Sequence, residues 1–600
     1  MNINPRETEK PGYKKGVFKR LAKYVLREWY LFIPAVVFTL LSNQLSLLGP
    51  KYSGQAIDAI EKVGGVDFGA VDKNVMLMLI CYVSSAVLSY LLSVIMIHLS
   101  QRIVYKMRGE VFEKLNTLPV SYFDRRPTGD IISSISYDID TINATLSHDL
   151  VQVMTSVYTV VGSLIFMWRI SIPMIAIFLV TVPISLVFTR FRSKKVRPLF
   201  RRRSRMYGEL NGYAEEMLSG LRSIEAYGRQ GVISKRFDDK NHATMDAYMD
   251  AERQAVMLGP TVNLINNLSL SLVAMMGGIL YMLSVGGKVS EVGLFFITLG
   301  GVAQFVQYSR KFAGPINEFA NIIHEFQSAF SAAERVFRIL DEAPEALDAE
   351  DAASLTETEG LVEIKNLTFG YTKEKTILKD VSVTAHPGKT IAIVGPTGAG
   401  KTTIINLLMR FYDPDSGEIC LDSIPTMKIK RADLRRAYTM VLQDTWLFHG
   451  TIYDNIVYGK ENATEAEVRA AAKAAKIDNY IESLPEGYNT ILSDEGVNIS
   501  KGQRQLITIA RAMLSDAPML ILDEATSNVD SRTEIKIQEA MNRLMKGRTC
   551  FVIAHRLSTV RNADTILVVK DGRIAEEGNH DELMELGGVY AHLYNSQFVS

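Results

Sequence analysis

Long apolar runs separated by polar segments fill the first 330 residues of the chain. The six runs lie at roughly 29–48, 75–99, 150–168, 170–188, 257–285 and 292–306. A helix needs about 20 mostly apolar residues to cross a bilayer, so the runs predict six membrane-spanning helices. The third and fourth runs are almost adjacent, which predicts a very short turn between their helices.

Basic residues are concentrated on one side of these predicted spans. Lys and Arg are frequent in residues 1–28 and again in residues 190–203, whereas the segments expected on the other side are short. Because basic loops stay on the cytoplasmic side, both termini are expected in the cytoplasm and the chain is expected to be a multi-pass protein of the cell membrane, plasma or inner. Six runs with this charge asymmetry disfavour the alternative, a soluble protein with buried apolar helices.

The remaining segments predict the domain organisation. Residues 100–147 and 190–256 are polar with helical periodicity, so we expect the spanning helices to continue into two long cytoplasmic loops. From residue 361 strand and helix patterns alternate, as in a soluble α/β domain. We therefore predict an N-terminal elbow segment at 1–28, a transmembrane domain at 29–330, a linker at 331–360 and the α/β domain at 361–600.

Composition excludes several classes of protein. The chain has 600 residues, with 66 Lys plus Arg balanced by 66 Asp plus Glu. This neutral balance gives no support for nucleic-acid binding through release of counterions. The 3 cysteines are scattered along the chain and form neither a disulfide framework nor a zinc motif.

A glycine-rich sequence directly follows the apolar segment 390–394. It fits the phosphate-loop pattern G-x-x-x-x-G-K-[ST] and consists of Gly395, Pro396, Thr397, Gly398, Ala399, Gly400, Lys401, Thr402 and Thr403. In such a loop the backbone N–H groups and the positive end of the next helix hold phosphates. Lys401 is expected to reach the β- and γ-phosphates, and the Thr402 hydroxyl is expected to ligate Mg²⁺. The pattern predicts a P-loop NTPase domain that uses ATP and Mg²⁺.

Two acidic residues end a second apolar segment. Asp523 and Glu524 follow the buried-strand pattern 519–522, about 120 residues after the phosphate loop. Asp523 is placed to hold the Mg²⁺ shell. Glu524 is placed to polarise a water aimed at the γ-phosphate, a role that typically contributes about 10²–10⁴-fold to a rate.

Further motifs lie before, between and after the phosphate loop and the acidic pair Asp523-Glu524. They are Phe369-Gly370-Tyr371, Val441-Leu442-Gln443-Asp444, Asn498-Ile499-Ser500-Lys501-Gly502-Gln503, Ser527-Asn528-Val529-Asp530 and His555. With this set the chain resembles the ATP-binding-cassette (ABC) exporters that fuse six spans to one nucleotide-binding domain. The resemblance covers nearly the whole chain, so we expect a membrane α-helical bundle of six long transmembrane helices plus an α/β P-loop NTPase domain.

The resemblance implies roles for several residues. Tyr371 matches the aromatic residue that stacks on adenine, and Gln443 matches the glutamine that contacts Mg²⁺ and the attacking water. His555 matches the switch histidine at the γ-phosphate, so Glu524, His555 and Gln443 form the expected catalytic set. The signature residues Ser500, Lys501, Gly502 and Gln503 are expected to cap ATP that is bound to a partner domain.

The signature also departs from the family pattern. Lys501 stands where the family prefers glycine, and Asn528 replaces the commoner alanine. Some ABC exporters are heterodimers in which one chain combines the consensus glutamate with a deviant signature. The chain resembles that subunit of the heterodimeric bacterial multidrug exporters, so a second half-transporter chain is the favoured partner. A homodimer with a tolerated Lys501 remains the alternative.

Polar residues in the last two predicted spans are candidates for a substrate path. Asn263, Asn266 and Asn267 share one face of the fifth span, and Gln304 and Gln307 share one face of the sixth. Polar side chains in membrane helices tend to face the bundle interior or a water-filled cavity. They equally form hydrogen bonds between helices, and the sequence leaves both readings open.

These features predict ATP-driven export of amphipathic compounds, either drugs or lipids, by ATP-dependent dimerisation of nucleotide-binding domains and alternating access. The expected partners are a second half-transporter, membrane lipid and a small amphipathic substrate. A lipid flippase and a peptide exporter are alternatives within transport. A regulatory subunit that senses ATP with little hydrolysis is the alternative from another class, and the intact Glu524, Gln443 and His555 argue against it.

Overall fold

The computed structural model describes residues 13–598 except 63–64, 287–294, 356, 444, 493–498, 524–529 and 555–556. The chain forms two compact units, which are treated separately below. Unit 1 comprises Met1–Asn116 and Thr128–Glu342, and unit 2 comprises Thr117–Pro127 and Ala343–Ser600. The fold class expected from the sequence, a bundle of long apolar helices plus an α/β nucleotide-binding domain, is confirmed.

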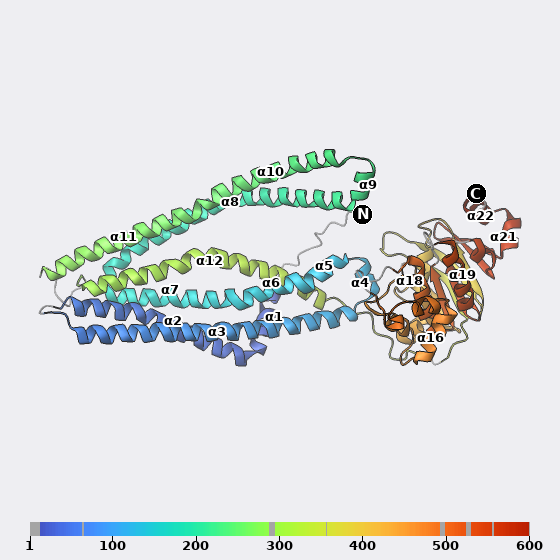
Figure 1. The fold of residues 1–600 in the computed structure, drawn as a ribbon, viewed down its shortest axis with the longest axis horizontal. Helices are drawn as coiled ribbons and strands as arrows, with labels where there is room; N and C mark the ends of the chain where they lie inside the picture. Colours follow the sequence, from blue (N-terminus) through green and yellow to red (C-terminus); the bar gives the residue numbers. More distant parts are fainter. Residues whose placement is uncertain are drawn as a thin grey trace. The chain divides into compact units, whose positions relative to one another are not determined.

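Unit 1 consists of long helices (Figure 1). In chain order these are α1 (Tyr13–Arg27), α2 (Trp29–Ile60), α3 (Phe68–Asn116), α5 (Thr128–Ser133), α6 (Ile139–Ala144), α7 (Leu150–Ile170), α8 (Ile172–Ser219), α9 (Leu221–Ala226), α10 (Gln230–Val256), α11 (Leu258–Val285) and α12 (Leu299–Leu340). Two π-helical turns, η1 (Ser134–Asp138) and η2 (Thr145–Asp149), join α5, α6 and α7 into one rod.

Five helical stretches among the described residues are long and apolar enough to cross a membrane. They are Trp29–Ile60, Phe68–Asn116, Thr128–Ile170, Ile172–Ser219 and Gln230–Val285, and they contain the first five predicted spans. The sixth predicted span, 292–306, begins within residues that the structure does not describe and continues into α12. The very short turn predicted between the third and fourth spans is the single residue Ser171, whose backbone is extended (φ −161°).

Each of the two long loops contains a short helix. In the first loop the short helix is α4 (Val120–Asp124), and residues 125–127 form the turn after it. Residues 207–213 lie inside α8, which continues unbroken to Ser219. The break comes at Gly220, after which α9 forms the short helix of the second loop. Apolar periodicity did not reveal that break, because the helical pattern continues on both sides of it.

Unit 2 contains an antiparallel sheet and a mainly parallel sheet. The first has the order β2-β1-β4-β5 and the second the order β12-β11-β3-β10-β9-β6. The first is built from β1 (Val362–Phe369), β2 (Leu378–Ala385), β4 (Ser416–Leu421) and β5 (Ile424–Pro425). The second is built from β3 (Thr390–Val394), β6 (Tyr438–Val441), β9 (Met519–Asp523), β10 (Thr549–Ile553), β11 (Thr565–Lys570) and β12 (Arg573–Gly578). A two-stranded ribbon pairs β7 (Gly450–Thr451) with β8 (Ile491–Leu492).

Helices flank these strands along the chain of unit 2. They are α13 (Lys401–Leu408), α14 (Arg431–Arg436), α15 (Ile452–Val457), α16 (Glu465–Ala474), α17 (Asp478–Glu482), α18 (Lys501–Leu514), α19 (Ser531–Met545), α20 (Leu557–Arg561), α21 (His580–Leu586) and α22 (Val589–Phe598), with 3₁₀ turns η3 (Thr426–Lys428) and η4 (Gly487–Asn489).

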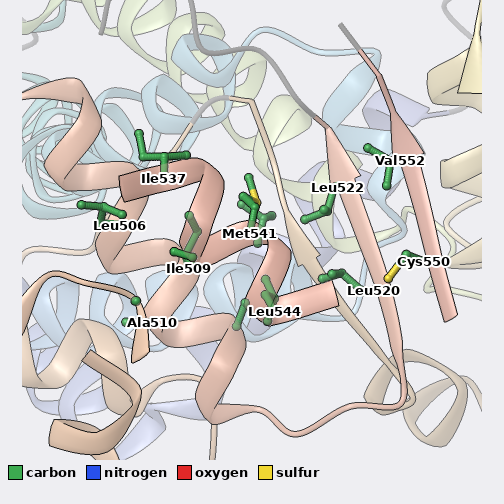
Figure 2. Close-up of a cluster of buried hydrophobic side chains, with 14 of the residues drawn as sticks. Leu506, Ile509, Ala510, Leu520, Leu522, Ile537, Met541, Leu544, Cys550 and Val552 are labelled. Carbon is green, nitrogen blue, oxygen red and sulfur yellow. The ribbon is translucent and has the colours of Figure 1, made fainter. Parts of the chain in front are cut away.

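The parallel sheet is buried on both faces. Successive side chains of a strand point to opposite faces, so Leu520 and Leu522 of β9 pack against α18 and α19 (Figure 2). Ile521 belongs to the other cluster, which includes the antiparallel sheet. Burying each such side chain stabilises the fold by about 1.5–3 kcal/mol. Both layers therefore hold the carboxyl ends of the central strands rigidly in place.

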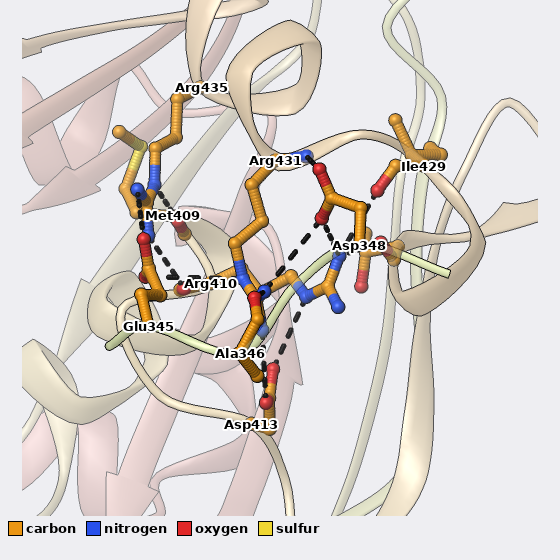
Figure 3. Close-up of polar contacts among 10 residues, drawn as sticks. Glu345, Ala346, Asp348, Met409, Arg410, Asp413, Ile429, Arg431 and Arg435 are labelled. Atoms are coloured by element: carbon orange, nitrogen blue, oxygen red, sulfur yellow. Dashed lines mark hydrogen bonds and ion pairs between the residues drawn. The ribbon is translucent and has the colours of Figure 1, made fainter. Parts of the chain in front are cut away.

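Charged residues fix the start of unit 2 onto its own core (Figure 3). Arg435 donates to Glu345 at 2.5 and 3.1 Å, and Arg431, only 7% exposed, donates to Asp413 and to the carbonyl of Ala346. The predicted linker, 331–360, is thus divided in the structure. Its first ten residues, 331–340, belong to α12 in unit 1, whereas its part from Ala343 onward is bonded to unit 2.

Candidate ATP site

The phosphate loop joins β3 to α13. β3 is a short buried strand whose carboxyl end leads directly into Gly395. Gly395 has φ 150°, and a Cβ there would lie 2.2 Å from the carbonyl oxygen of Val569. Gly400 has φ 109°, and a Cβ there would lie 2.7 Å from Leu378. Only glycine fits both positions, so the backbone curls into the phosphate-loop shape that the sequence predicts.

Lys401 begins α13 and folds back over the loop. Its Nζ donates to the carbonyl oxygens of Gly395 at 2.8 Å and Pro396 at 3.0 Å. Partial burial lowers the pKa of Lys401, and the charge of Asp523 acts in the opposite direction. The ammonium is therefore held at the loop by neutral carbonyl groups, which a phosphate can replace as partners.

Four parallel strands bring separate motifs to one edge of the sheet. In the order β3-β10-β9-β6, Ile553 pairs with both Ile393 and Asp523, and Val441 pairs with Leu522. The strands thus end at the same level. The phosphate loop, Asp523 and the segment that contains Gln443 all continue from this edge, as ligand-binding residues do in parallel sheets.

Two of the three expected catalytic residues, Glu524 and His555, lie outside the described residues. In the sequence Glu524 directly follows Asp523, the last residue of β9, and His555 follows Ala554, which comes directly after β10. Gln443 is exposed and lies two residues beyond β6. The roles assigned to Glu524, His555 and Gln443 stay predictions.

Tyr371 follows β1 and packs among aromatic rings. Its ring lies edge-on to that of Tyr412, with centroids 4.9 Å apart, and its hydroxyl donates to Thr403 Oγ1 at 3.3 Å. Asn406 in turn donates to the Tyr371 hydroxyl. These contacts link Tyr371 to α13, the helix that starts at the phosphate loop, so its expected contact with adenine stays a prediction consistent with this position.

The described part of the signature motif begins α18. Ser500 is the N-cap, with its Oγ accepting from the Gln503 backbone N–H at 3.2 Å while Gln503 Oε1 accepts from the Ser500 N–H at 2.9 Å. Lys501 is the first residue of the helix and is exposed, whereas Gly502 is buried. The start of α18 therefore presents Ser500 and Lys501 at the surface of unit 2, and their contact with a partner's ATP stays a prediction.

The residues of the loop fit ATP and Mg²⁺. Side chains at Gly395 and Gly400 would clash with the fold, Lys401 supplies a cation, and the Thr402 side chain is exposed at the start of α13. Together with Asp523 and Gln443, Thr402 offers the oxygen ligands that Mg²⁺ prefers. Bound Mg²⁺ would neutralise phosphate charge, and Lys401 would orient the phosphates.

The polar residues of the last two predicted spans are distributed over two environments. Asn266 and Asn267 line a cavity between α8, α11 and α12 that Asn263 does not line. Gln307 instead donates to Ser53 on α2 at 3.0 Å, and a Cβ at Gly54 of α2 would collide with the side chain of Gln304. The substrate-path reading of these five residues stays a prediction.

The sequence prediction missed Arg310, which also lines the cavity. The sequence feature that could have indicated Arg310 is its position as a charged residue just after the sixth apolar run. The contact between Asp124 and Tyr412 was missed as well. Its partners are far apart in the sequence, and no pattern links them.

The chain belongs to the ABC transporter family. The model of the ABC transporter transmembrane region matches residues 31–308, and the ABC transporter model matches residues 378–527. One chain therefore supplies one transmembrane domain and one nucleotide-binding domain, which makes it a half-transporter. It is a multi-pass membrane protein that couples hydrolysis of ATP, with Mg²⁺, to transport, and ABC exporters of this type work as dimers.

Curated relatives cover most of the chain. The uncharacterized ABC transporter ATP-binding protein YfiC of Bacillus subtilis is 39% identical over 97% of this chain and 94% of its own length. A fatty acid ABC transporter ATP-binding/permease protein of Mycobacterium bovis is 42% identical over 88% of this chain and 81% of its own. An ATP-dependent lipid A-core flippase of Syntrophus aciditrophicus is 33% identical over 99% of this chain and 96% of its own length.

A solved structure supports the same architecture. A bacterial Atm1-family ABC exporter with ATP bound superposes with a TM-score of 0.75 at 29% identity, over 95% of this chain and 98% of the other. The chain is thus an ABC exporter in fold and in domain composition.

Proposed function

We propose that this half-transporter exports lipid-like amphipathic compounds across the cell membrane by alternating access. In this proposal ATP joins two nucleotide-binding domains, and its hydrolysis separates them again. Glu524 polarises the attacking water, while Gln443 and His555 contact the metal and the γ-phosphate. The observation that supports this most directly is the common level at which β3, β10, β9 and β6 end, since the phosphate loop and the segments that contain His555, Glu524 and Gln443 follow these strands.

The cargo is proposed from two observations. Relatives at 42% and 33% identity carry the names of a fatty acid transporter and a lipid A-core flippase. The cavity between α8, α11 and α12 combines amides with the aromatic rings of Phe178 and Phe312. A mixed polar and apolar lining suits a molecule with a headgroup and a chain. Drugs of similar amphipathic character are the second candidate cargo, because the same lining would accept them.

We further propose a heterodimer with both termini and the nucleotide-binding domain in the cytoplasm. Lys501, exposed at the start of α18, would cap an ATP site on the partner chain that hydrolyses slowly. Lys401 and Glu524 would then serve the hydrolysing site. The basic segments at 1–28 and 190–203 support the cytoplasmic orientation.

The composition of the dimer is tested by expressing this chain alone in lipid nanodiscs and measuring particle mass and Mg-ATPase. The heterodimer predicts a monomer, or a dimer with ATPase close to that of Glu524→Gln. A stable dimer whose ATPase depends on Glu524 would contradict the heterodimer and support the homodimer. Binding of ATP without hydrolysis, even beside a consensus partner, would instead support the regulatory-subunit alternative.

A further inference from the structure

A cavity of about 310 Å³ lies between α8, α11 and α12 of unit 1. α8 contributes Thr181 and Ser185, near the end of the fourth predicted span that leads into the long polar loop. α11 contributes Asn266, near the corresponding end of the fifth span. The cavity therefore lies at membrane depth, in the half of the spans closer to the long polar loops.

Polar groups in this cavity have capacity left for a ligand. Thr181 and Ser269 bond each other at 3.0 Å, and Ser309 donates to a carbonyl of its own helix. By contrast, the side-chain amides of Asn266 and Asn267 make no hydrogen bond to any residue in the described part of the chain. Asn266 is partly buried and Asn267 is exposed, so their N–H groups are available as donors to a ligand.

Arg310 adds a permanent positive charge to the same cavity. It lies on α12 four residues after the sixth predicted span, 292–306, and lines the cavity together with residues of the fourth and fifth spans. No carboxylate or other hydrogen-bond partner of Arg310 occurs among the residues that the structure describes. Its neighbour Lys311 differs, because its Nζ donates to Ser46 Oγ on α2 at 2.7 Å.

Charged side chains inside membranes are costly and usually pair with an opposite charge. Among the residues that the structure describes, the cavity lining includes no Asp or Glu. Arg310 is exposed, so its guanidinium is available to an anion from outside the chain. The planar guanidinium offers two parallel N–H donors, which match a carboxylate or a phosphate.

The rest of the lining is apolar or small. Phe178, Val182 and Leu270 surround the polar end, and Ala313 and Gly314 leave space on α12. A Cβ built at Gly314 meets no atom within 4 Å, so this side of the helix is open. An acyl chain would lie against these groups while its headgroup meets the amides.

We infer that Arg310, Asn266 and Asn267 form a binding site for the anionic headgroup, carboxylate or phosphate, of an acyl-chain amphiphile. The inference rests on the proposed function, since it names the class of amphiphile that is transported. It predicts a clear preference for anionic over neutral or cationic molecules of the same chain length.

Native mass spectrometry of the detergent-solubilised full chain tests this without ATP turnover. The probes are palmitate, palmitoyl lysophosphatidate, methyl palmitate and hexadecyltrimethylammonium. Palmitate and lysophosphatidate are expected to bind, and the tighter of the two identifies the headgroup. Arg310→Gln should weaken both by about 10- to 100-fold and leave methyl palmitate within about twofold. Unchanged palmitate affinity in Arg310→Gln, or tighter binding of the ester or the ammonium, would overturn the inference.

Three further variants separate binding from folding. Arg310→Lys keeps the charge and should retain part of the affinity, whereas Arg190→Gln removes a similar charge on α8 outside the cavity and should change nothing. Gly314→Leu should fill the open space and weaken every probe, the methyl ester included. Loss of palmitate affinity in Arg190→Gln equal to that in Arg310→Gln would reject the site.

Failure of the site and failure of the proposed function give different results. Binding that depends on Arg310, without any movement of lipid driven by ATP, would reject the export function and keep the site. Movement of lipid driven by ATP, with palmitate affinity unchanged in Arg310→Gln, would reject the site alone.

Discussion

Asp138 in η1 and Arg335 on α12 form a bidentate ion pair, with Arg335 Nε and Nη2 donating to the two carboxylate oxygens at 2.8 and 2.5 Å. The Asp138 side chain is 3% exposed, whereas that of Arg335 is half exposed. Hydrogen bonding to Asp138 raises the pKa of Arg335. The pair joins segments 197 residues apart, just before α12 ends at Leu340.

Arg335→Ala is expected to destabilise the transmembrane unit, because it leaves a buried carboxylate without its partner. The expected cost is about 1–3 kcal/mol, measured as a lower unfolding temperature in detergent. Arg338→Ala is the matched control on the same helix. Arg338 pairs with Glu334 at 3.3 Å and is exposed, so its loss should cost less than about 0.5 kcal/mol. Equal effects of the two variants would contradict this assignment.

Lys401→Ala should weaken ATP binding at the phosphate loop. The side chain is expected to supply a charged contact to the β- and γ-phosphates, so the dissociation constant for a fluorescent ATP analogue should rise about 10- to 100-fold. Lys389→Ala removes a lysine that pairs with Asp564 outside the loop and should leave binding within about twofold. The site assignment fails if both variants bind nucleotide alike.

Ser500→Ala should have two separable effects. Loss of the N-cap of α18 should cost about 1 kcal/mol of stability, as should Thr464→Ala at the capping box of α16. Only Ser500→Ala should also reduce the ATPase of the assembled transporter, since Ser500 is expected to contact the partner's ATP. A similar ATPase in the two variants would leave Ser500 with a structural role alone.

Tyr412→Phe should uncouple hydrolysis from transport. Its hydroxyl donates to Asp124 of α4 at 2.7 Å, within the segment that unit 2 takes from the first loop. Burial and this bond raise the pKa of Tyr412, so the phenol stays protonated at neutral pH. We expect transport to fall about tenfold while ATPase stays within about twofold. Asp124→Asn should reduce transport to a similar extent. If the hydrogen bond is the cause, the double variant should lose no more transport than either single variant.

Much of the ATP site could be predicted from the sequence, because its motifs are local. The phosphate loop needs glycine at positions such as Gly395 and Gly400, and a buried strand leads into it. Asp523 lies on the same edge of the sheet as that loop because of the order of the strands. The strand order comes from the structure and could not be predicted from the sequence. The five long apolar stretches were predictable for a similar reason, since membrane depth sets their length.

Contacts between distant segments could not be predicted. Residues 117–127 belong to the nucleotide-binding unit, although in the sequence they stand between α3 and α5 of the membrane unit. Arg431 and Arg435 bind the start of unit 2 through residues such as Glu345, and no periodic pattern marks that network. Arg310 was missed because charged residues after an apolar run, here Arg310 and Lys311, indicate the end of a span as readily as a ligand site.

The central claim is that hydrolysis at Glu524 drives lipid from one side of the membrane to the other. The direct measurement is ATP-dependent movement of a fluorescent acyl lipid between the leaflets of vesicles that contain the assembled transporter, compared with Glu524→Gln. We predict movement that needs both ATP and Mg²⁺ and falls at least about 100-fold in Glu524→Gln, with nucleotide binding retained. Equal movement by the two proteins, or lipid movement in the absence of ATP, would contradict the account.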